Sequence, residues 1–317
     1  DNSGAGIIAT PLISHLETKE HKAVDTDESI LVLEQSLKWP RLSSKDEKSL
    51  LTPRLEGYQL SVTALLQFLD VSQGGPQQFL ERQMLRLPTA STTNMAYGTA
   101  LHRALQYAQL RTNTGKYKLA DTLKEYQQAL LEQQLSISEH RKFLSHGEKV
   151  ITNLFERQDF KLIKGDQPET SIRQINLGGA TLNGDFDHIH QIENELVITD
   201  YKTGKPMSSF ASKDKTKAYK AWRHRTQLVF YYILASKSPR FADINNITTQ
   251  MLYVEAEANE SLRLPYVPDN AMIKRQSDLI IAVWAKINNL DFVDTSAYSD
   301  DYSGVTAFED DLLAGKI

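Results

Sequence analysis

The spacing of the apolar positions divides this chain into three stretches. Between residues 61 and 158 apolar side chains recur every three or four positions, which predicts helices over 61–69, 77–85, 95–109, 119–135 and 137–158. Between 171 and 202 the spacing changes to two, which predicts strands over 171–177, 180–190 and 195–202. Helical spacing returns over 217–235 and 270–288, and a further strand is expected at 248–255. This order of elements predicts an α/β (α+β) domain with a central mixed β-sheet flanked by helices.

The two ends of the chain show weaker patterns. We interpret residues 1–56 as a leader or linker from a larger protein, partly disordered, and 57–317 as the domain itself. In the leader an amphipathic helix is expected over 28–38, and residues 43–48 are expected to form a loop. From Asp291 the sequence carries seven acids and a single base, Lys316, so this tail is expected to be rich in loops.

The composition excludes several kinds of site. The 317 residues include no cysteine, which rules out disulfides, thiolate zinc sites and an iron–sulfur cluster held by cysteines. No apolar run approaches the roughly 18 residues that a membrane span requires, and no phosphate-binding loop for ATP is present. We therefore expect a cytoplasmic protein that has no contact with a membrane and no ATP site in this chain.

The net charge of −4 hides a concentration of positive charge between residues 202 and 225. Eight bases and one acid, Asp214, lie in this stretch. Such a segment in an otherwise acidic chain predicts contact with a polyanion such as DNA, although a solvated lysine-rich loop would have the same composition. Apart from Lys202, the bases of this stretch are the predicted DNA-binding residues: Lys205, Lys213, Lys215, Lys217, Lys220, Arg223 and Arg225.

A predicted hairpin brings two aspartates together. If Glu193-Asn194 forms a tight two-residue turn, the strands on either side pair so that Asp187 lies opposite Asp200, with Cβ atoms about 5 Å apart. A slip of one residue would turn Asp187 to the other face and leave the neighbouring Asp185 as the alternative.

The hairpin suggests a cation site. Two facing carboxylates repel each other, and a divalent cation that prefers oxygen ligands, Mg²⁺ or Mn²⁺, would remove that cost. Lys202 follows Asp200 by two residues and therefore projects to the same face, where it can stabilise charge on a phosphate. The alternative is that Asp-Tyr-Lys is an ordinary strand sequence with no chemical role.

Two helical pairs could support this site. His102 lies one turn after Gly98, and the glycine is expected to allow another backbone to approach closely. Gln227 and Tyr231 lie one turn apart on another predicted helix. His102 could be a metal ligand or a satisfied core histidine, and the second pair could be catalytic or simply packed.

Taken in order, these residues resemble a known family. The matching motifs are Ser61-Val62-Thr63 with Phe68-Leu69, Gly98-x-x-x-His102, Gly184-x-Phe186-Asp187, Asp200-Tyr201-Lys202-Thr203-Gly204-Lys205 and Gln227-x-x-x-Tyr231. Over residues 57–290 the chain resembles the RecB-like branch of the PD-(D/E)xK nuclease superfamily. Its nuclease domain commonly forms the C-terminal part of a helicase or helicase-like subunit.

The resemblance implies a restriction-endonuclease-like core and a role for each matched residue. His102, Asp187, Asp200 and the main-chain carbonyl of Tyr201 would bind Mg²⁺ or Mn²⁺. Asp187, Asp200 and Lys202 would be catalytic, and so would two residues that match the motif after the core, Gln227 and Tyr231.

The activity implied is metal-dependent hydrolysis of DNA phosphodiesters, with exonuclease action favoured over endonuclease action. The expected partners are DNA, either single-stranded or at duplex ends, and a helicase domain in cis or in a partner subunit, in DNA repair or recombination. Some relatives hold an iron–sulfur cluster with four cysteines that this chain lacks, and His188 stands where an arginine is frequent. A catalytically silent DNA- or partner-binding module remains the alternative, and a metal-free glycoside hydrolase is disfavoured by Lys202 and the basic stretch.

Overall fold

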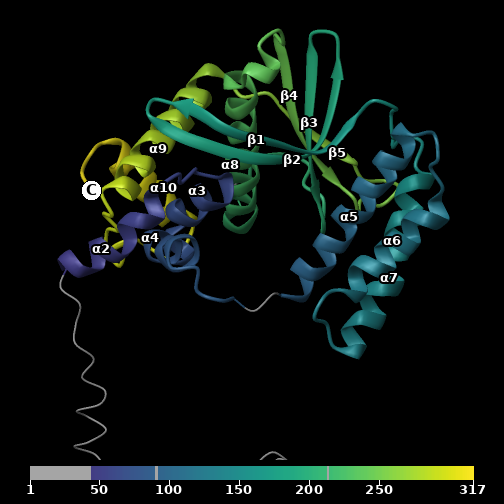
Figure 1. Ribbon diagram of the computed structural model, residues 1–317, viewed down its shortest axis with the longest axis horizontal. Coiled ribbons are helices and arrows are strands. Elements are labelled where there is room, and N and C mark those ends of the chain that lie inside the picture. The colour runs from purple at the N-terminus through teal and green to yellow at the C-terminus, as the bar shows by residue number, and fades with distance from the viewer. Residues whose placement is uncertain (1–43, 90–91, 213) are drawn as a thin grey trace, which may run out of the picture. The chain divides into compact units, whose positions relative to one another are not determined.

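The alternating stretch of the sequence forms one mixed sheet (Figure 1). In a computed structural model, which describes residues 44–89, 92–212 and 214–317, five strands lie in the order β1-β2-β3-β4-β5. They are β1 (Gln167–Leu177), β2 (Ala180–Ile192), β3 (Glu195–Lys202), β4 (Asn246–Tyr253) and β5 (Arg263–Tyr266). The pair β3–β4 is parallel and the other pairs are antiparallel. The short β5, which contains Pro265, was not expected, because its four residues carry no clear alternation.

Helices cover both faces of the sheet (Figure 1). The parallel pair β3–β4 requires a crossover connection, and α8 (Lys215–Lys237) supplies it. The side chains of Ile189 and Ile198 lie in a core with α8, whereas Tyr201 and Leu252 lie in a second core with three helices on the other face. The three helices are α5 (Thr93–Asn113), α6 (Leu119–Leu131) and α7 (Ile137–Glu156).

The α8 side is completed by shorter elements. They are α3 (Val62–Leu69), η1 (Val71–Gln73), α4 (Gly75–Phe79), the π-helical turn η2 (Leu80–Met84), η3 (Pro239–Phe241), α9 (Asn270–Asn288) and α10 (Tyr302–Leu313). The Ser61 hydroxyl caps the start of α3, where it accepts a hydrogen bond from Ala64 N. These elements belong to the unit Leu51–Ile317, which is distinct from the unit Asp1–Leu50.

One expectation about the chain ends was wrong, and another was incomplete, because the loop-rich tail also contains a helix. Residues 44–48 are helical, at the start of α2 (Ser44–Leu55), because polarity alone does not prevent lysine and glutamate from forming a helix. The acidic tail contains α10, whose apolar residues Val305, Phe308 and Leu312 recur at helical spacing and are buried. The helix expected over 28–38 lies outside the described residues.

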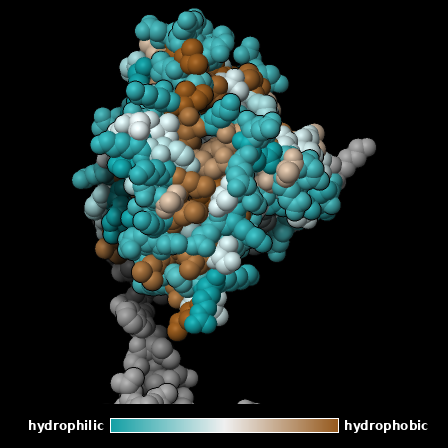
Figure 2. Space-filling view, turned by 90° about the vertical axis from the view of Figure 1, so that its right-hand side faces the viewer, coloured by the Kyte–Doolittle hydropathy of each residue, from teal (hydrophilic) through white to brown (hydrophobic). Residues whose placement is uncertain are grey.

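The face formed by α5–α7 carries apolar side chains at its surface. In the view from this side they form a stripe bordered by polar side chains (Figure 2). Leu131 and Ile137, on these helices, are 64% and 76% exposed. No helix in the described part of the chain is long and apolar enough to cross a bilayer.

The packing of α6 against α7 supports α5, which carries His102. The fully buried Tyr126 donates a hydrogen bond to the Phe143 carbonyl at 2.6 Å and lies directly over Gly147. A Cβ at position 147 would overlap the Tyr126 hydroxyl and ring.

Gly147→Ala is therefore expected to lower the free energy of unfolding by about 1–3 kcal/mol, because overpacking outweighs the better helix propensity of alanine. Urea denaturation followed by circular dichroism measures the change. Ser145→Ala, on the exposed side of the same helix, is the control and should stay within about 0.5 kcal/mol of the wild type. Equal stability of the two variants would contradict this account of the packing.

Candidate active site

The β2–β3 hairpin has the predicted register. Ile192 pairs with Glu195, and the pairing continues without a shift to His188 and Thr199. The ladder ends there, one residue before Asp187 would pair with Asp200. At this point the backbone N–H of Tyr201 donates to the Asp187 carboxylate at 2.8 Å. Asp187 therefore lies at the place where the two strands part.

The choice between the two neighbouring acids follows from this geometry. Asp185 is 61% exposed on its side chain and pairs with Arg173 at 2.7 Å, next to β1. The Asp187 side chain is only 19% exposed, and one of its oxygens lies 3.3 Å from His102 Nδ1. Asp187, and not Asp185, is thus the acid that lies beside β3 and α5.

Asp200 is the most buried group of the cluster, with 3% of the residue exposed. Its Oδ1 accepts a hydrogen bond from Gln227 Nε2 at 2.6 Å and one from the Tyr231 hydroxyl at 3.3 Å. Its Oδ2 lies 2.7 Å from Lys202 Nζ. The Lys202 ammonium is therefore the charged partner of this buried oxygen.

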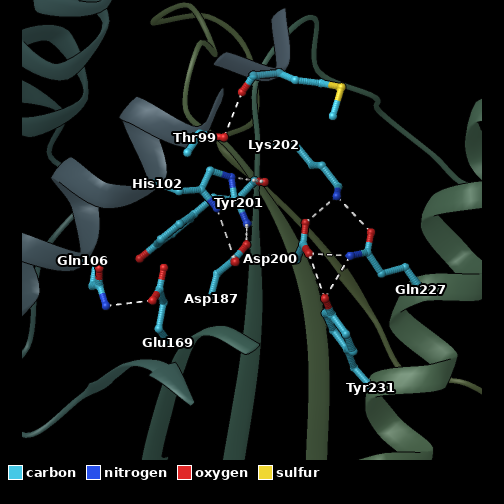
Figure 3. Close-up of polar contacts among 11 residues, drawn as sticks. Thr99, His102, Gln106, Glu169, Asp187, Asp200, Tyr201, Lys202, Gln227 and Tyr231 are labelled. Carbon is cyan, nitrogen blue, oxygen red and sulfur yellow. Dashed lines mark hydrogen bonds and ion pairs between the residues drawn. The ribbon is translucent and has the colours of Figure 1, made fainter. Parts of the chain in front are cut away.

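Gln227 connects the lysine to the rest of this network. Its Oε1 accepts from Lys202 Nζ at 2.8 Å, while its Nε2 also donates to the Tyr231 hydroxyl at 2.9 Å. One turn of α8 therefore fixes both the catalytic candidate Lys202 and the carboxylate of Asp200 (Figure 3).

The opposite side of the cluster is formed by α5 (Figure 3). His102 Nε2 lies 3.1 Å from the carbonyl oxygen of Tyr201, and its ring meets the Tyr201 ring edge-on. The carbonyl of Tyr201 thus points to the site although its side chain is buried in the core with α5–α7. The predicted residues of the hairpin, of α5 and of α8 lie together in one place.

Burial and mutual repulsion disfavour the ionised forms of the carboxylates in this cluster. Burial raises the pKa of Asp200, and the charge of Asp187 raises it further, against the opposing effect of Lys202. Burial acts to lower the pKa of His102, but its hydrogen bond to Asp187 and the charges of both aspartates outweigh this effect and raise the pKa. Additional positive charge would therefore stabilise the ionised carboxylates.

The donor set fits a hard divalent cation. Two carboxylates, an imidazole and a main-chain carbonyl are ligands that Mg²⁺ or Mn²⁺ accepts, and Asp200 Oδ2 is a buried oxygen that forms an ion pair with Lys202. Among the described residues no three His, Asp or Glu side chains already have the spacing of a metal site. The reason is that the Asp187 carboxylate turns to Tyr201 N and the Asp200 carboxylate to Gln227 and Lys202.

Part of the basic stretch lies beside this cluster. Arg223 lines the same hollow as Lys202 and Gln227. Burial, followed by the charges of Lys202, Lys220 and Arg223, lowers the pKa of His224 to about 3. Lys220 also donates to the carbonyl of Lys205 at 2.7 Å and so holds the loop that follows β3.

Other cations of the stretch lie elsewhere. Lys215 pairs with Asp301 at 2.9 Å, and Arg225 lines a small cavity between α8 and α9. Lys217 is exposed on the first turn of α8, and Lys213 lies outside the described residues. Their contact with DNA remains a prediction.

The sequence interpretation missed Glu169, beside His102. A hollow of about 490 Å³ next to His102 is lined by Gly98, Thr99, Arg103, Gln106 and Glu169. Glu169 has a left-handed φ of 42°, a strained conformation for a side chain of this kind, and accepts a hydrogen bond from Gln106 at 2.8 Å. The predicted strand begins at 171, four residues after the actual start of β1 at Gln167, so Glu169 fell outside it.

Gly98 has a different role from the one expected. A Cβ at this position would have Thr203 Oγ1, at 3.8 Å, as its nearest neighbour, which is an ordinary contact. Among the described residues no other backbone lies within 4 Å of this Cβ, so the expectation was wrong. The missing side chain instead leaves room in the hollow next to His102.

A five-stranded mixed sheet between helical layers, with Asp187 and Asp200-Tyr201-Lys202 on neighbouring strands, defines a restriction-endonuclease-like α/β fold. The family model of the PD-(D/E)XK nuclease superfamily matches residues 59–300, and the chain belongs to this superfamily. A solved structure titled "Crystal structure of SSO0001" is similar to it at 16% identity, over 82% of this chain and 87% of that one, with a TM-score of 0.26. No curated protein matches the chain.

Proposed function

We propose that this protein is an active, divalent-metal-dependent deoxyribonuclease. One observation supports this above all: Lys202 Nζ lies within hydrogen-bond distance of both Asp200 and Gln227, at the point where Asp187 and His102 also meet. Silent relatives would be expected to lose an acid or the lysine, and this chain retains all of them.

Each residue of the cluster has a role in this proposal. His102, Asp187, Asp200 and the Tyr201 carbonyl would hold Mg²⁺ or Mn²⁺. The ion supplies Lewis-acid chemistry, polarising a phosphoryl oxygen and making water more acidic. Lys202 stabilises the charge that develops on the phosphate in the transition state, because its ammonium is already fixed and needs no reorientation.

Gln227 and Tyr231 act as positioning residues in this scheme. Gln227 binds Lys202 through its oxygen and Asp200 through its nitrogen, so it fixes the separation of the two charged groups. Tyr231 supports the same carboxylate oxygen from one turn further along α8.

Within the superfamily, we place this protein in the RecB-like branch. We further propose that it is part of a helicase–nuclease involved in DNA repair or recombination. The ordered motifs from Ser61 to Tyr231 support this branch, as does the absence of any conflict between their spacing and the fold. Exonuclease action on single strands or duplex ends is favoured, with the helicase part in cis or in a partner subunit and a cytoplasmic location.

Metal removal tests the central proposal. We expect the purified protein to degrade linear single-stranded DNA in Mn²⁺ or Mg²⁺, to stop in EDTA, and to resume when the metal is restored in excess. Gel analysis of an end-labelled oligonucleotide and of a circular single strand measures both the activity and its exonuclease character. Cleavage that persists in EDTA would contradict metal dependence. DNA binding without cleavage in either metal would identify the silent module instead.

A further inference from the structure

A second hollow adjoins the cluster on the side of α3. Its volume is about 380 Å³, and its polar lining consists mainly of Gln67, Gln73, Gln78, Gln227, Lys202 and Arg223. No carboxylate is among the residues that line it. It therefore offers amides and positive charge, the groups that accommodate a phosphate backbone, and it shares Lys202 and Gln227 with the candidate active site.

Arg223 is held in this hollow by a buried acid. Asp70, 1% exposed, lies at the end of α3, where its backbone N–H bonds to the Leu66 carbonyl at 3.0 Å. Its Oδ2 accepts from Arg223 Nη1 at 2.7 Å and from the Tyr219 hydroxyl, and its Oδ1 accepts from Ser72 Oγ at 2.6 Å. Both oxygens of the Asp70 carboxylate therefore already accept hydrogen bonds from within the protein.

The Arg223 guanidinium, in contrast, makes hydrogen bonds with only part of its donors. Both of its hydrogen bonds to described residues, to Asp70 and to the Tyr219 hydroxyl at 3.3 Å, come from Nη1. Nε and Nη2 have no hydrogen-bond partner in the described part of the chain, and 43% of the side chain is exposed. One edge of the planar group is therefore fixed, and other donors remain free to bind a ligand.

We propose that Arg223, oriented by Asp70 and Tyr219, binds a DNA phosphate next to the scissile one, so that the strand continues from Lys202 into this hollow. An arginine fits this task because its planar fork bonds to phosphate oxygens with two parallel donors. The inference rests on the proposed nuclease function. The inference concerns Arg223 alone, because Arg225, two residues later, lines a different cavity.

The competing explanation is that Arg223 only neutralises Asp70 and thereby joins α8 to α3. Under that explanation Arg223→Gln weakens DNA binding through loss of stability, and removing both charges in Asp70→Asn/Arg223→Gln restores binding along with stability. If Arg223 binds phosphate, the double variant recovers thermal stability while its affinity stays low.

Binding is measured in EDTA, where metal-dependent cleavage stops, by fluorescence anisotropy of a labelled single-stranded oligonucleotide at several salt concentrations. Arg223→Gln is expected to lower affinity about tenfold, as loss of a charged hydrogen bond does. The slope of log affinity against log salt should fall by about 0.7, the value for one phosphate contact on a single strand. The control Lys237→Gln, exposed on the last turn of α8, should keep both the affinity and the slope of the wild type.

Oligonucleotides with one uncharged methylphosphonate linkage locate the contact. Scanned along the strand, such a linkage should weaken wild-type binding at the linkage that contacts Arg223, and the same linkage should have no further effect on Arg223→Gln. Additive losses at every linkage, or equal affinities for Arg223→Gln and Lys237→Gln, would overturn the inference.

The binding test of Arg223 and the cleavage test of the nuclease proposal can fail independently of each other. If the wild type cleaves DNA in Mn²⁺ but Arg223→Gln binds like the wild type, this inference fails while the nuclease proposal stands. If the wild type never cleaves DNA but loses affinity at one linkage through Arg223, the nuclease proposal fails while the phosphate contact stands.

Discussion

Replacing Lys202 by methionine is expected to slow DNA cleavage by about 10²–10³-fold, the usual cost of removing one fixed group that stabilises transition-state charge. The ammonium lies 2.7 Å from Asp200 Oδ2 and 2.8 Å from Gln227 Oε1, so its position is determined before a substrate binds. Methionine keeps much of the length of the side chain and removes its charge. Single-turnover cleavage with Mn²⁺ in excess reports the chemical step without product release.

The same variant should still bind Mn²⁺, because lysine offers no lone pair to a metal when protonated. Calorimetric titration measures the affinity, which is expected to equal or exceed that of the wild type once the competing ion pair with Asp200 is gone. Lys237→Met, exposed on the last turn of α8, is the control. Lys202→Met that cleaves DNA as fast as this control would remove the lysine from the mechanism.

Asp200→Asn is expected to abolish cleavage, by at least about 10³-fold, since groups that act as a unit fail together. It should also lose most of its Mn²⁺ affinity, because a neutral amide replaces the charged ligand in the most buried part of the site.

The same change should raise the melting temperature when no metal is present. Burial and the charge of Asp187 raise the pKa of Asp200 in the folded protein above the ordinary value of an aspartate. A raised carboxyl pKa means that the folded state loses stability as the pH rises from the unfolded value through the folded pKa, and the full loss remains above it. Asparagine removes this loss at neutral pH, although Lys202 then lacks its partner.

Thermal unfolding followed by circular dichroism in EDTA, over a series of pH values, tests this prediction. The variant should be the more stable protein at neutral pH, and its advantage should shrink towards acid pH, where the wild-type carboxyl is protonated. Excess Mn²⁺ should then stabilise the wild type and not the variant. A variant that is less stable than the wild type at neutral pH would show that the ion pair with Lys202 outweighs the cost of burial.

The hairpin could be predicted from the sequence because its determinants are local. A two-residue turn and a period of two fix the register, and Asp187 and Asp200 follow from it with no knowledge of the remaining fold. His102 and Gln227 are different, since they reach the hairpin from helices on opposite faces of the sheet. Spacing alone left both of them ambiguous, and the ordered resemblance brought them together.

The contact between Asp70 and Arg223 could not be found in this way. The two residues are 153 positions apart, and neither belongs to a recognised spacing. The helix in the acidic tail was missed for another reason. Charge was given more weight there than the apolar positions of Val305 and Phe308, which repeat at helical spacing.

Tyr201, which lies between Asp200 and Lys202 in the sequence, illustrates a limit of mutational scanning. Tyr201 contributes to the cluster through its peptide groups, an N–H bonded to Asp187 and a carbonyl close to His102, while its ring is buried on the other face. Apart from proline, which removes the N–H, no side-chain exchange deletes either group. A scan of activity would therefore score position 201 only by how well each replacement fills the second core, and it would miss a residue whose backbone holds both the acid and the histidine in place.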